Sequence, residues 1–381
     1  MKKKFLAVFT GIILILTCFL TCLSGCSCSS RSVLEFNKYF YGTQTNTPTS
    51  YKEVCEYNVT LEGSNVQENI KSNLPEIEGT MVTTFESSIK IKEELNSLLK
   101  DTPSDLINDS TNNIAIYKFT TDFNVTVRHE CIIDNKEYND DNTPNVNYNP
   151  DGINYDSIKT VVYFFSQDSG FAPIYTTTSY NYTSFAITEN DSASVVTYGK
   201  CSTLYQKDSY TLTEAYAYTL EDVEKEEYQN TKTINYTYKT LIDNAQLLFA
   251  IRNIDVLEDS NAYIPVVSYQ YDEAKDLVFM NLGSSATAPD FKVDYKLNDT
   301  ENEYSKSVFK AISFKINSQY NSGALQTIYI QEKEADENVT ENSLPYNALL
   351  YQYEKPLLEY SSNASMGSLL HTLTNVEITK Q

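Results

Sequence analysis

Residues 210–220, with the sequence YTLTEAYAYTL, decide the fold class of this 381-residue chain. Side chains alternate along this stretch, so that one face of an extended segment would carry Tyr210, Leu212, Tyr216 and Tyr218. The opposite face would carry Thr211, Thr213, Ala215 and Ala217. A period of two residues is typical of a half-buried β-strand, because successive Cβ atoms point to opposite faces of the sheet.

The same alternation recurs from Tyr51 onward and predicts a series of strands. We expect them at residues 114–133, 158–165, 174–182, 195–198, 234–238, 263–271, 277–280, 291–297, 308–316, 326–330, 349–353 and 369–378. These segments are rich in Tyr, Thr, Val and Ile, which suit pleated sheets. Because few helical segments lie between them, we predict a mainly antiparallel sheet rather than a parallel sheet built from βαβ units.

Helices are expected at residues 65–72, 88–100 and 241–254. The last of these is apolar over most of its circumference and must therefore be buried. We predict a large antiparallel sheet that curls into a half-barrel and encloses this helix. Two β-sandwich domains, with a boundary near residues 258–261, are the alternative. The order of elements loosely resembles that of lipoprotein-carrier and related extracytoplasmic lipid-binding proteins, and this resemblance implies an apolar cavity.

The first 26 residues have the pattern of an export signal. Lysines occupy positions 2–4, and residues 5–23 are apolar apart from Thr, Cys and one Gly. The run ends in Leu23-Ser24-Gly25-Cys26, which resembles the lipobox of bacterial prolipoproteins. The resemblance implies cleavage after Gly25 and a diacylglycerol group on the Cys26 sulfur. An uncleaved membrane anchor, or a standard signal followed by an ordinary cysteine, would be the alternatives.

This resemblance divides the chain into a signal peptide (residues 1–25), a lipidated N-terminus and tether (26–50) and a β body (51–381). Acyl chains such as palmitate contribute ~0.8 kcal/mol per buried methylene, so two of them hold a protein on a membrane almost permanently. We therefore expect the protein on the outer face of the cell membrane. Of the four remaining cysteines, Cys28, Cys55, Cys131 and Cys201, we expect no disulfide or one.

The charge balance and the lack of motifs exclude several function classes. The chain has 51 acidic and 29 basic side chains and a net charge of -22, which disfavours nucleic acid as a partner. His129 and His371 are its only histidines. Zinc sites with several histidine ligands and histidine-based catalytic triads are therefore not expected. No sequence motif marks a catalytic residue, and the prediction leans against an enzyme.

A weak calcium-loop pattern runs from Asn147 to Asp156. Oxygen-bearing side chains at Asn147, Asn149 and Asp151 precede Gly152, as in the first half of a calcium loop. The twelfth position is Ile158 instead of a bidentate Glu, and Asp156 at the tenth position would ligate only in a different geometry. A solvated hairpin loop is the competing interpretation, and no other cofactor is expected.

The 31 tyrosines favour a binding surface, although Tyr is also an ordinary strand residue and the chain has no Trp. We therefore expect a noncatalytic binding or structural protein whose ligand is an apolar or cell-wall molecule or a protein partner. The alternative is a glycan- or wall-modifying hydrolase that uses a pair of carboxylates not marked by sequence. An apolar groove beside residues 241–254 would favour the first, and two facing carboxylates the second.

Overall fold

The computed structural model describes residues 50–62, 76–107, 116–128, 153–167, 170–187, 192–237, 241–253, 262–267, 275–281, 291–298, 303–309, 311–318, 326–331, 357–364 and 367–380. All of them belong to one compact unit, Leu34–Gln381. The predicted signal peptide, Cys26 and most of the tether lie outside the described residues. So do the expected helix at 65–72, the expected strand at 349–353 and the boundary at 258–261.

Strands dominate the described residues, as the alternation predicts. They are β1 (Tyr51–Glu62), β2 (Glu76–Ser87), β3 (Ile116–Arg128), β4 (Ile153–Gln167), β5 (Gly170–Ile187), β6 (Ser192–Tyr205), β7 (Ser209–Ala217), β8 (Gln229–Asn235), β9 (Ile242–Asp243), β10 (Ala262–Val267), β11 (Lys275–Asn281), β12 (Phe291–Asn298), β13 (Glu303–Phe309), β14 (Ala311–Ser318), β15 (Gln326–Gln331), β16 (Leu357–Ala364) and β17 (Gly367–Lys380). The helical elements are α2 (Ile89–Leu98), η4 (Asp222–Glu224), η5 (Glu226–Tyr228), η6 (Asn244–Gln246), α3 (Leu247–Ala250) and η7 (Ile251–Asn253).

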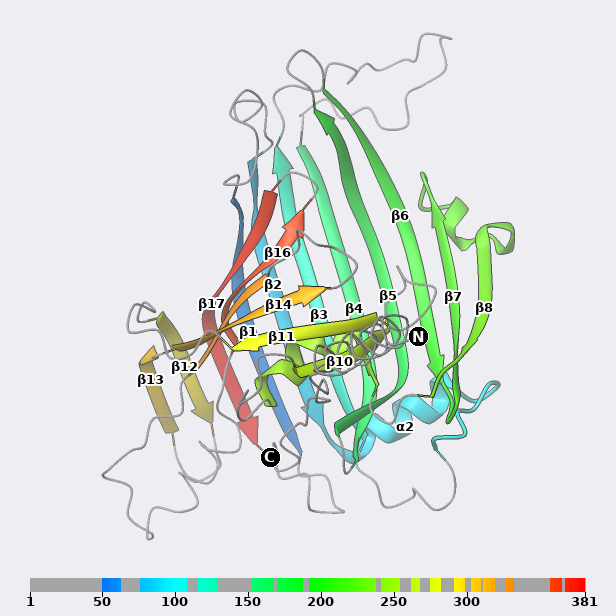
Figure 1. The fold of residues 1–381 in the computed structure, drawn as a ribbon, viewed down its shortest axis with the longest axis horizontal. Coiled ribbons are helices and arrows are strands. Elements are labelled where there is room, and N and C mark those ends of the chain that lie inside the picture. Colours follow the sequence, from blue (N-terminus) through cyan, green and yellow to red (C-terminus); the bar gives the residue numbers. More distant parts are fainter. Residues whose placement is uncertain are drawn as a thin grey trace, which may run out of the picture. The chain divides into compact units, whose positions relative to one another are not determined.

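Antiparallel pairing joins consecutive strands from β1 to β8, and β2 to β6 are long, curved neighbours (Figure 1). On its other edge β1 pairs with β17, and pairing continues through β16, β15, β14 and β11 to β10. Two pairings are parallel, β9 with β10 and β12 with β17. One large and mainly antiparallel sheet therefore contains strands from both sides of residues 258–261.

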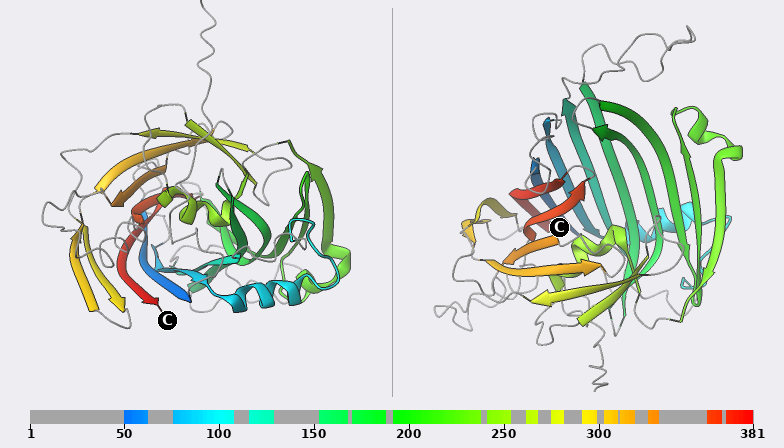
Figure 2. Two further views of the ribbon diagram at one scale, coloured as in Figure 1. Left: turned by 90° about the horizontal axis from the view of Figure 1, so that it is seen from below. Right: turned by 45° about the horizontal axis from the view of Figure 1, so that its top comes forward.

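The main core lies on the inner face of this sheet, around the predicted apolar segment. Phe249 of α3 is buried among the rings of Phe85, Phe119, Phe164 and Phe171. Figure 2 shows the segment from η6 to η7 inside the curve of the sheet and α2 outside it. The predicted mainly β fold, with a curled sheet around one apolar helical segment, is confirmed.

The apolar segment is shorter and less regular than the expected helix over 241–254. Its first residues, Ile242 and Asp243, instead pair with Val266 and Val267 of β10. The Asp243 carboxylate then accepts a hydrogen bond from the Ala245 N–H at 2.8 Å and caps the first turn. Helical structure consequently begins at Asn244 and continues as a 3-10 turn, one α turn and another 3-10 turn.

A buried ion pair ties the end of this segment to β1. Arg252 donates to the two carboxylate oxygens of Glu53 at 2.5 and 3.0 Å, and both side chains are almost fully buried. The two residues are 199 positions apart in the chain. The ion pair therefore fixes the helical segment against the inner face of the sheet.

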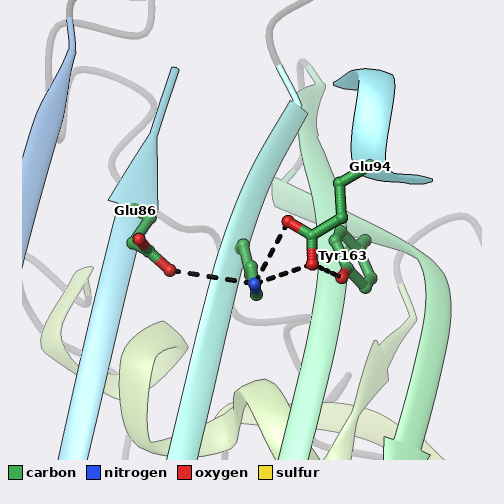
Figure 3. Close-up of polar contacts among 4 residues, drawn as sticks. Glu86, Glu94 and Tyr163 are labelled. Carbon is green, nitrogen blue, oxygen red and sulfur yellow. Dashed lines mark hydrogen bonds and ion pairs between the residues drawn. The ribbon is translucent and has the colours of Figure 1, made fainter. Parts of the chain in front are cut away.

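The predicted helix at 88–100 is confirmed as α2, which packs on the outer face. A second core cluster holds three apolar residues of this helical region together with strand residues on the same face: Ile91, Leu95, Leu99, Ile116, Tyr163 and Ile174. Glu94 accepts a hydrogen bond from Lys118 at 2.9 Å. It accepts another, at 2.7 Å, from the hydroxyl of Tyr163, and Figure 3 shows these two side chains side by side. Burial alone would raise the pKa of Glu94, but these two donors hold it below its ordinary value.

Residues 209–217 form β7 with the alternation that the sequence predicts. Tyr210 and Leu212 are buried on one face, whereas Tyr216 on the same face and Tyr218 beyond the strand are exposed. Ala215 and Ala217, on the opposite face, are buried against Val223 of η4. The buried face of β7 thus changes half-way along the strand, because η4 folds back over its outer side.

Two of the four candidate cysteines, Cys55 and Cys201, lie in the described part of the chain, where both are buried and free. Cys28 and Cys131 lie outside it, so the prediction of no disulfide or one remains a prediction. Within the described ranges, no helix is long and apolar enough to span a membrane.

Candidate functional site

A cavity of about 460 Å³ lies on the inner face of the sheet, beside η6 and α3. Its walls come from β1 to β5, from β16 and β17, and from the helical segment, with the lining residues Leu61, Ile77, Met81, Thr121, Phe123, Val125, Val127, Asp156, Ile158, Thr160, Tyr182, Thr183, Asn244, Ala245, Leu247, Leu248, Tyr360, Ser362, Leu369 and His371. This volume falls in the range of about 300–1,000 Å³ that is usual for small-molecule sites.

Strand alternation explains why the cavity walls are apolar. Ile77 and Met81 of β2 point inward, whereas Thr80 between them is exposed on the outer face. Phe123, Val125 and Val127 line the cavity from β3 in the same way. Inward-facing apolar residues of the curved sheet therefore meet Leu247 and Leu248 of the helical segment across the cavity.

His371 is the most buried polar group of the wall, with 3% of its surface exposed. It lies opposite Tyr360 in the pairing of β16 with β17, and the two rings stack with centroids 4.2 Å apart. Its Nε2 is 2.9 Å from the Ser362 hydroxyl, while its Nδ1 has no hydrogen-bond partner among the described residues. Burial lowers the pKa of His371 to about 4, so the ring is neutral near pH 7.

Asp156 brings a carboxyl group to the same wall, and 9% of its surface is exposed. Its two oxygens accept hydrogen bonds from the Thr183 backbone N–H at 2.8 Å and from the Thr183 hydroxyl at 2.7 Å. Burial raises the pKa of Asp156, and the two bonds from Thr183 partly counter that effect. The described lining residues include no Lys or Arg that would pair with this carboxyl group.

Of the four calcium candidates, Asp156 alone lies in the described part of the chain. Asn147, Asn149 and Asp151 lie outside it. Within the described residues, no group of three His, Cys, Asp or Glu side chains is arranged to hold a metal ion. The calcium site stays a prediction, and Asp156 belongs to the wall of the cavity.

The hydrolase alternative requires two carboxyl groups about 5–9.5 Å apart. Among the described lining residues of the cavity, Asp156 is the single carboxyl group, and both of its oxygens are already bonded to Thr183. Many tyrosines serve the core instead of a ligand surface, for example Tyr57, Tyr117 and Tyr205. The described part of the cavity wall is therefore mainly apolar, with His371, Ser362 and Asp156 among its polar residues.

The resemblance to lipid-binding half-barrels implies an apolar cavity, and a groove beside residues 241–254 is the feature that favours a binding protein, but the sequence does not identify the residues of the wall. In the sequence, His371 stands out only as one of two histidines. Its position between Leu369 and Leu373 on an alternating strand is nevertheless a signal that its side chain faces inward. Comparisons of the chain with protein-family models, curated proteins and solved structures find no match. The chemistry of the cavity itself must therefore suggest the function.

Proposed function

We propose that this protein holds the apolar chain of a lipid in the cavity beside η6 and α3, without catalysing a reaction on it. The single observation that carries this proposal is the 460 Å³ cavity, whose walls are largely apolar and converge on the helical segment. An apolar ligand in such a site replaces water on surfaces that the fold leaves uncovered.

The expected binding free energy and the cavity volume both favour a single acyl chain as the ligand. About ten methylenes removed from water contribute roughly 8 kcal/mol at ~0.8 kcal/mol each. Association costs on the order of 4–15 kcal/mol, so burial of the acyl chain alone gives a modest affinity. Polar contacts to the head of the lipid would add to it. The cavity volume lies in the lower half of the usual range, which favours one acyl chain over two.

The lipobox residues Leu23-Ser24-Gly25-Cys26 support the second part of the proposal, an anchor at Cys26 that keeps the protein on the outer face of the cell membrane. Residues 27–50 would then separate the lipidated cysteine from the β body. Anchoring beside a bilayer places the cavity next to a supply of lipid. This arrangement suits a protein that collects, shields or presents a lipid at the membrane surface.

Cross-linking of a lipid in the cavity tests the proposed function. The full chain is mixed with phosphatidylcholine vesicles that contain a monoacylglycerol with a diazirine in its chain, and cross-linked peptides are mapped after illumination. We expect labels on the lining strands β2, β3 and β17. Ile77→Trp fills the cavity and should remove the labels, whereas Thr80→Trp on the outer face of the same strand should leave them unchanged. Labels absent from the lining strands of the unmodified protein would contradict the proposal.

A further inference from the structure

Exposed tyrosine rings lie on the inner face of the sheet next to the cavity. Tyr182 of β5 borders the cavity itself, and 40% of its surface is exposed. On the same strand Tyr180 lies opposite Ile158, another residue of the cavity wall, so both side chains point to the inner face. Tyr216 of β7 is 66% exposed. None of the three tyrosines belongs to a hydrophobic core cluster of the described residues.

Gly199 of β6 joins these rings into one surface. It pairs with Tyr180 on one side and with Tyr216 on the other, and β5, β6 and β7 lie side by side (Figure 1). A Cβ atom at position 199 would lie 2.0 Å from Cζ of Tyr180 and 2.2 Å from its hydroxyl oxygen. The Tyr180 ring therefore lies over the glycine backbone and reaches across β6 toward β7, which a larger residue at position 199 would prevent.

We call Tyr180, Tyr182 and Tyr216 the tyrosine platform. The rings of Tyr180 and Tyr182 pack against each other, with centroids 5.5 Å apart and planes 33° apart. Tyr182 also lines the cavity, so the platform is continuous with the proposed lipid site. At about 4.8 Å between neighbouring strands, the platform extends about 10 Å from β5 to β7. A head group joined to a chain in the cavity would lie over it.

The chemistry of exposed tyrosine favours a sugar as this head group. The face of an aromatic ring carries partial negative charge and attracts C–H groups, which a pyranose ring presents on its faces. The tyrosine hydroxyl both donates and accepts hydrogen bonds, as do the hydroxyls on the rim of a sugar. An acyl chain over the platform would bury the phenol hydroxyls without a partner, which costs free energy, whereas a sugar replaces the water bound to them.

We propose that the tyrosine platform binds the sugar head of a glycolipid whose single acyl chain lies in the cavity. This inference rests on the proposed function and names the ligand class of the same site. Tyr182 contacts the junction of chain and head, and Tyr180 and Tyr216 stack on the sugar.

Competition against the diazirine monoacylglycerol in the same vesicles tests the inference. The competitors, titrated over the same mole fractions, are monopalmitoylglycerol, its glucosyl derivative, and lysophosphatidylcholine with the same palmitoyl chain. With the unmodified full chain, we expect the glucosyl lipid to compete at least about tenfold better than either of the others, because only its head stacks on the platform. Equal competition by the three lipids, or better competition by lysophosphatidylcholine, would overturn the inference, while cross-links in the cavity would still support lipid binding.

Two variants assign the preference to the platform. Tyr216→Ala removes one exposed ring, and Gly199→Ala displaces the Tyr180 ring from β6. Each should reduce the advantage of the glucosyl lipid to about threefold or less, while labelling of the lining strands without a competitor stays unchanged. Tyr155→Ala, at an exposed ring of β4 outside the cavity wall, is the matched control and should keep the full advantage.

The outcomes distinguish this inference from the proposed function. An undiminished advantage of the glucosyl lipid in Tyr216→Ala would overturn the inference, and this variant decides alone if Gly199→Ala loses the labelling together with the fold. Absence of labels from the lining strands of the unmodified protein would instead contradict the proposed function.

Discussion

Phe249 of α3 stacks on Phe85 of β2, with ring centroids 4.7 Å apart and ring planes 7° apart. This contact joins the one apolar helical segment to the inner face of the sheet. Phe119, Phe164 and Phe171 surround the pair, so the position of Phe249 sets where the helical segment lies and thereby the adjoining wall of the cavity.

Replacement of Phe249 by Ala should be severely destabilising. Removal of a fully buried Phe from a core costs about 3–5 kcal/mol, because burial is lost and a cavity remains. Urea denaturation followed by circular dichroism measures the change. Tyr216→Ala, at an exposed ring of β7, should change the free energy of unfolding by less than about 0.5 kcal/mol. Similar denaturation midpoints for Phe249→Ala and the unmodified chain would show that the aromatic cluster does not hold the segment.

The ion pair between Glu53 and Arg252 should behave as a coupled unit. Glu53→Gln or Arg252→Met alone leaves a buried charge without its main partner, which costs about 3–5 kcal/mol. The double variant should be less destabilised than the sum of the two single changes, because neither charge then remains. Denaturation of all four proteins measures the coupling, and strictly additive losses would be inconsistent with the buried pair.

His371 should make stability depend on pH in a defined direction. Its pKa is lowered by burial from 6.5 to about 4, so between these values the unfolded chain binds more protons than the folded one. The folded state therefore loses stability as the pH falls from 6.5 to 4, up to about 3 kcal/mol for a shift of this size. Asp156, Asp243 and Glu359 have raised pKa values and act in the opposite direction.

Comparison with His371→Phe separates this contribution from the carboxyl groups, which titrate in both proteins. The difference in unfolding free energy between the two proteins should shift in favour of the variant as the pH is lowered through this window. Parallel stability curves from pH 7 to about pH 4 would mean that His371 binds its proton equally well in the folded and the unfolded chain, so that burial does not lower its pKa.

The resemblance of Leu23-Ser24-Gly25-Cys26 to a lipobox predicts that Cys26 determines membrane attachment. In bacteria expressing Cys26→Ser, the protein should leave the membrane fraction, and mass spectrometry of the unmodified protein should find an acylated cysteine at the new N-terminus. Cys28→Ser provides the matched control two residues away and should remain membrane-bound. Retention of the processed Cys26→Ser protein in the membrane would contradict the anchor.

The fold class was predictable because alternation is a local signal, but β1, β2 and β16 are absent from the expected strands. The inner face of β1 carries the acidic Glu53 before Cys55, Tyr57 and Val59, so the apolar alternation of this strand extends over only three residues. Arg252, which makes this burial tolerable, lies 199 residues away and cannot be paired with Glu53 from sequence. Tertiary partners of this kind override local patterns.

The site was predictable in kind but not in detail. The apolar segment at 241–254 predicts a helical segment buried against the sheet, and the resemblance to lipid-binding half-barrels implies an apolar cavity. The places of the polar wall residues instead depend on strand register, which brings His371 opposite Tyr360 and Asp156 opposite Val125. Register in a large sheet depends on long-range pairing, so these neighbours emerge only from the structure.

A single tryptophan in the cavity tests the central claim most directly. The chain has no Trp, so Phe123→Trp introduces the only indole, in the cavity wall. Vesicles that contain a monoacylglycerol brominated along its chain should quench this fluorescence saturably, and Ile77→Phe in the same background should weaken the quenching. Tyr216→Trp, at an exposed position, should not be quenched. Equal quenching at both positions, or none at 123, would contradict a lipid chain in the cavity.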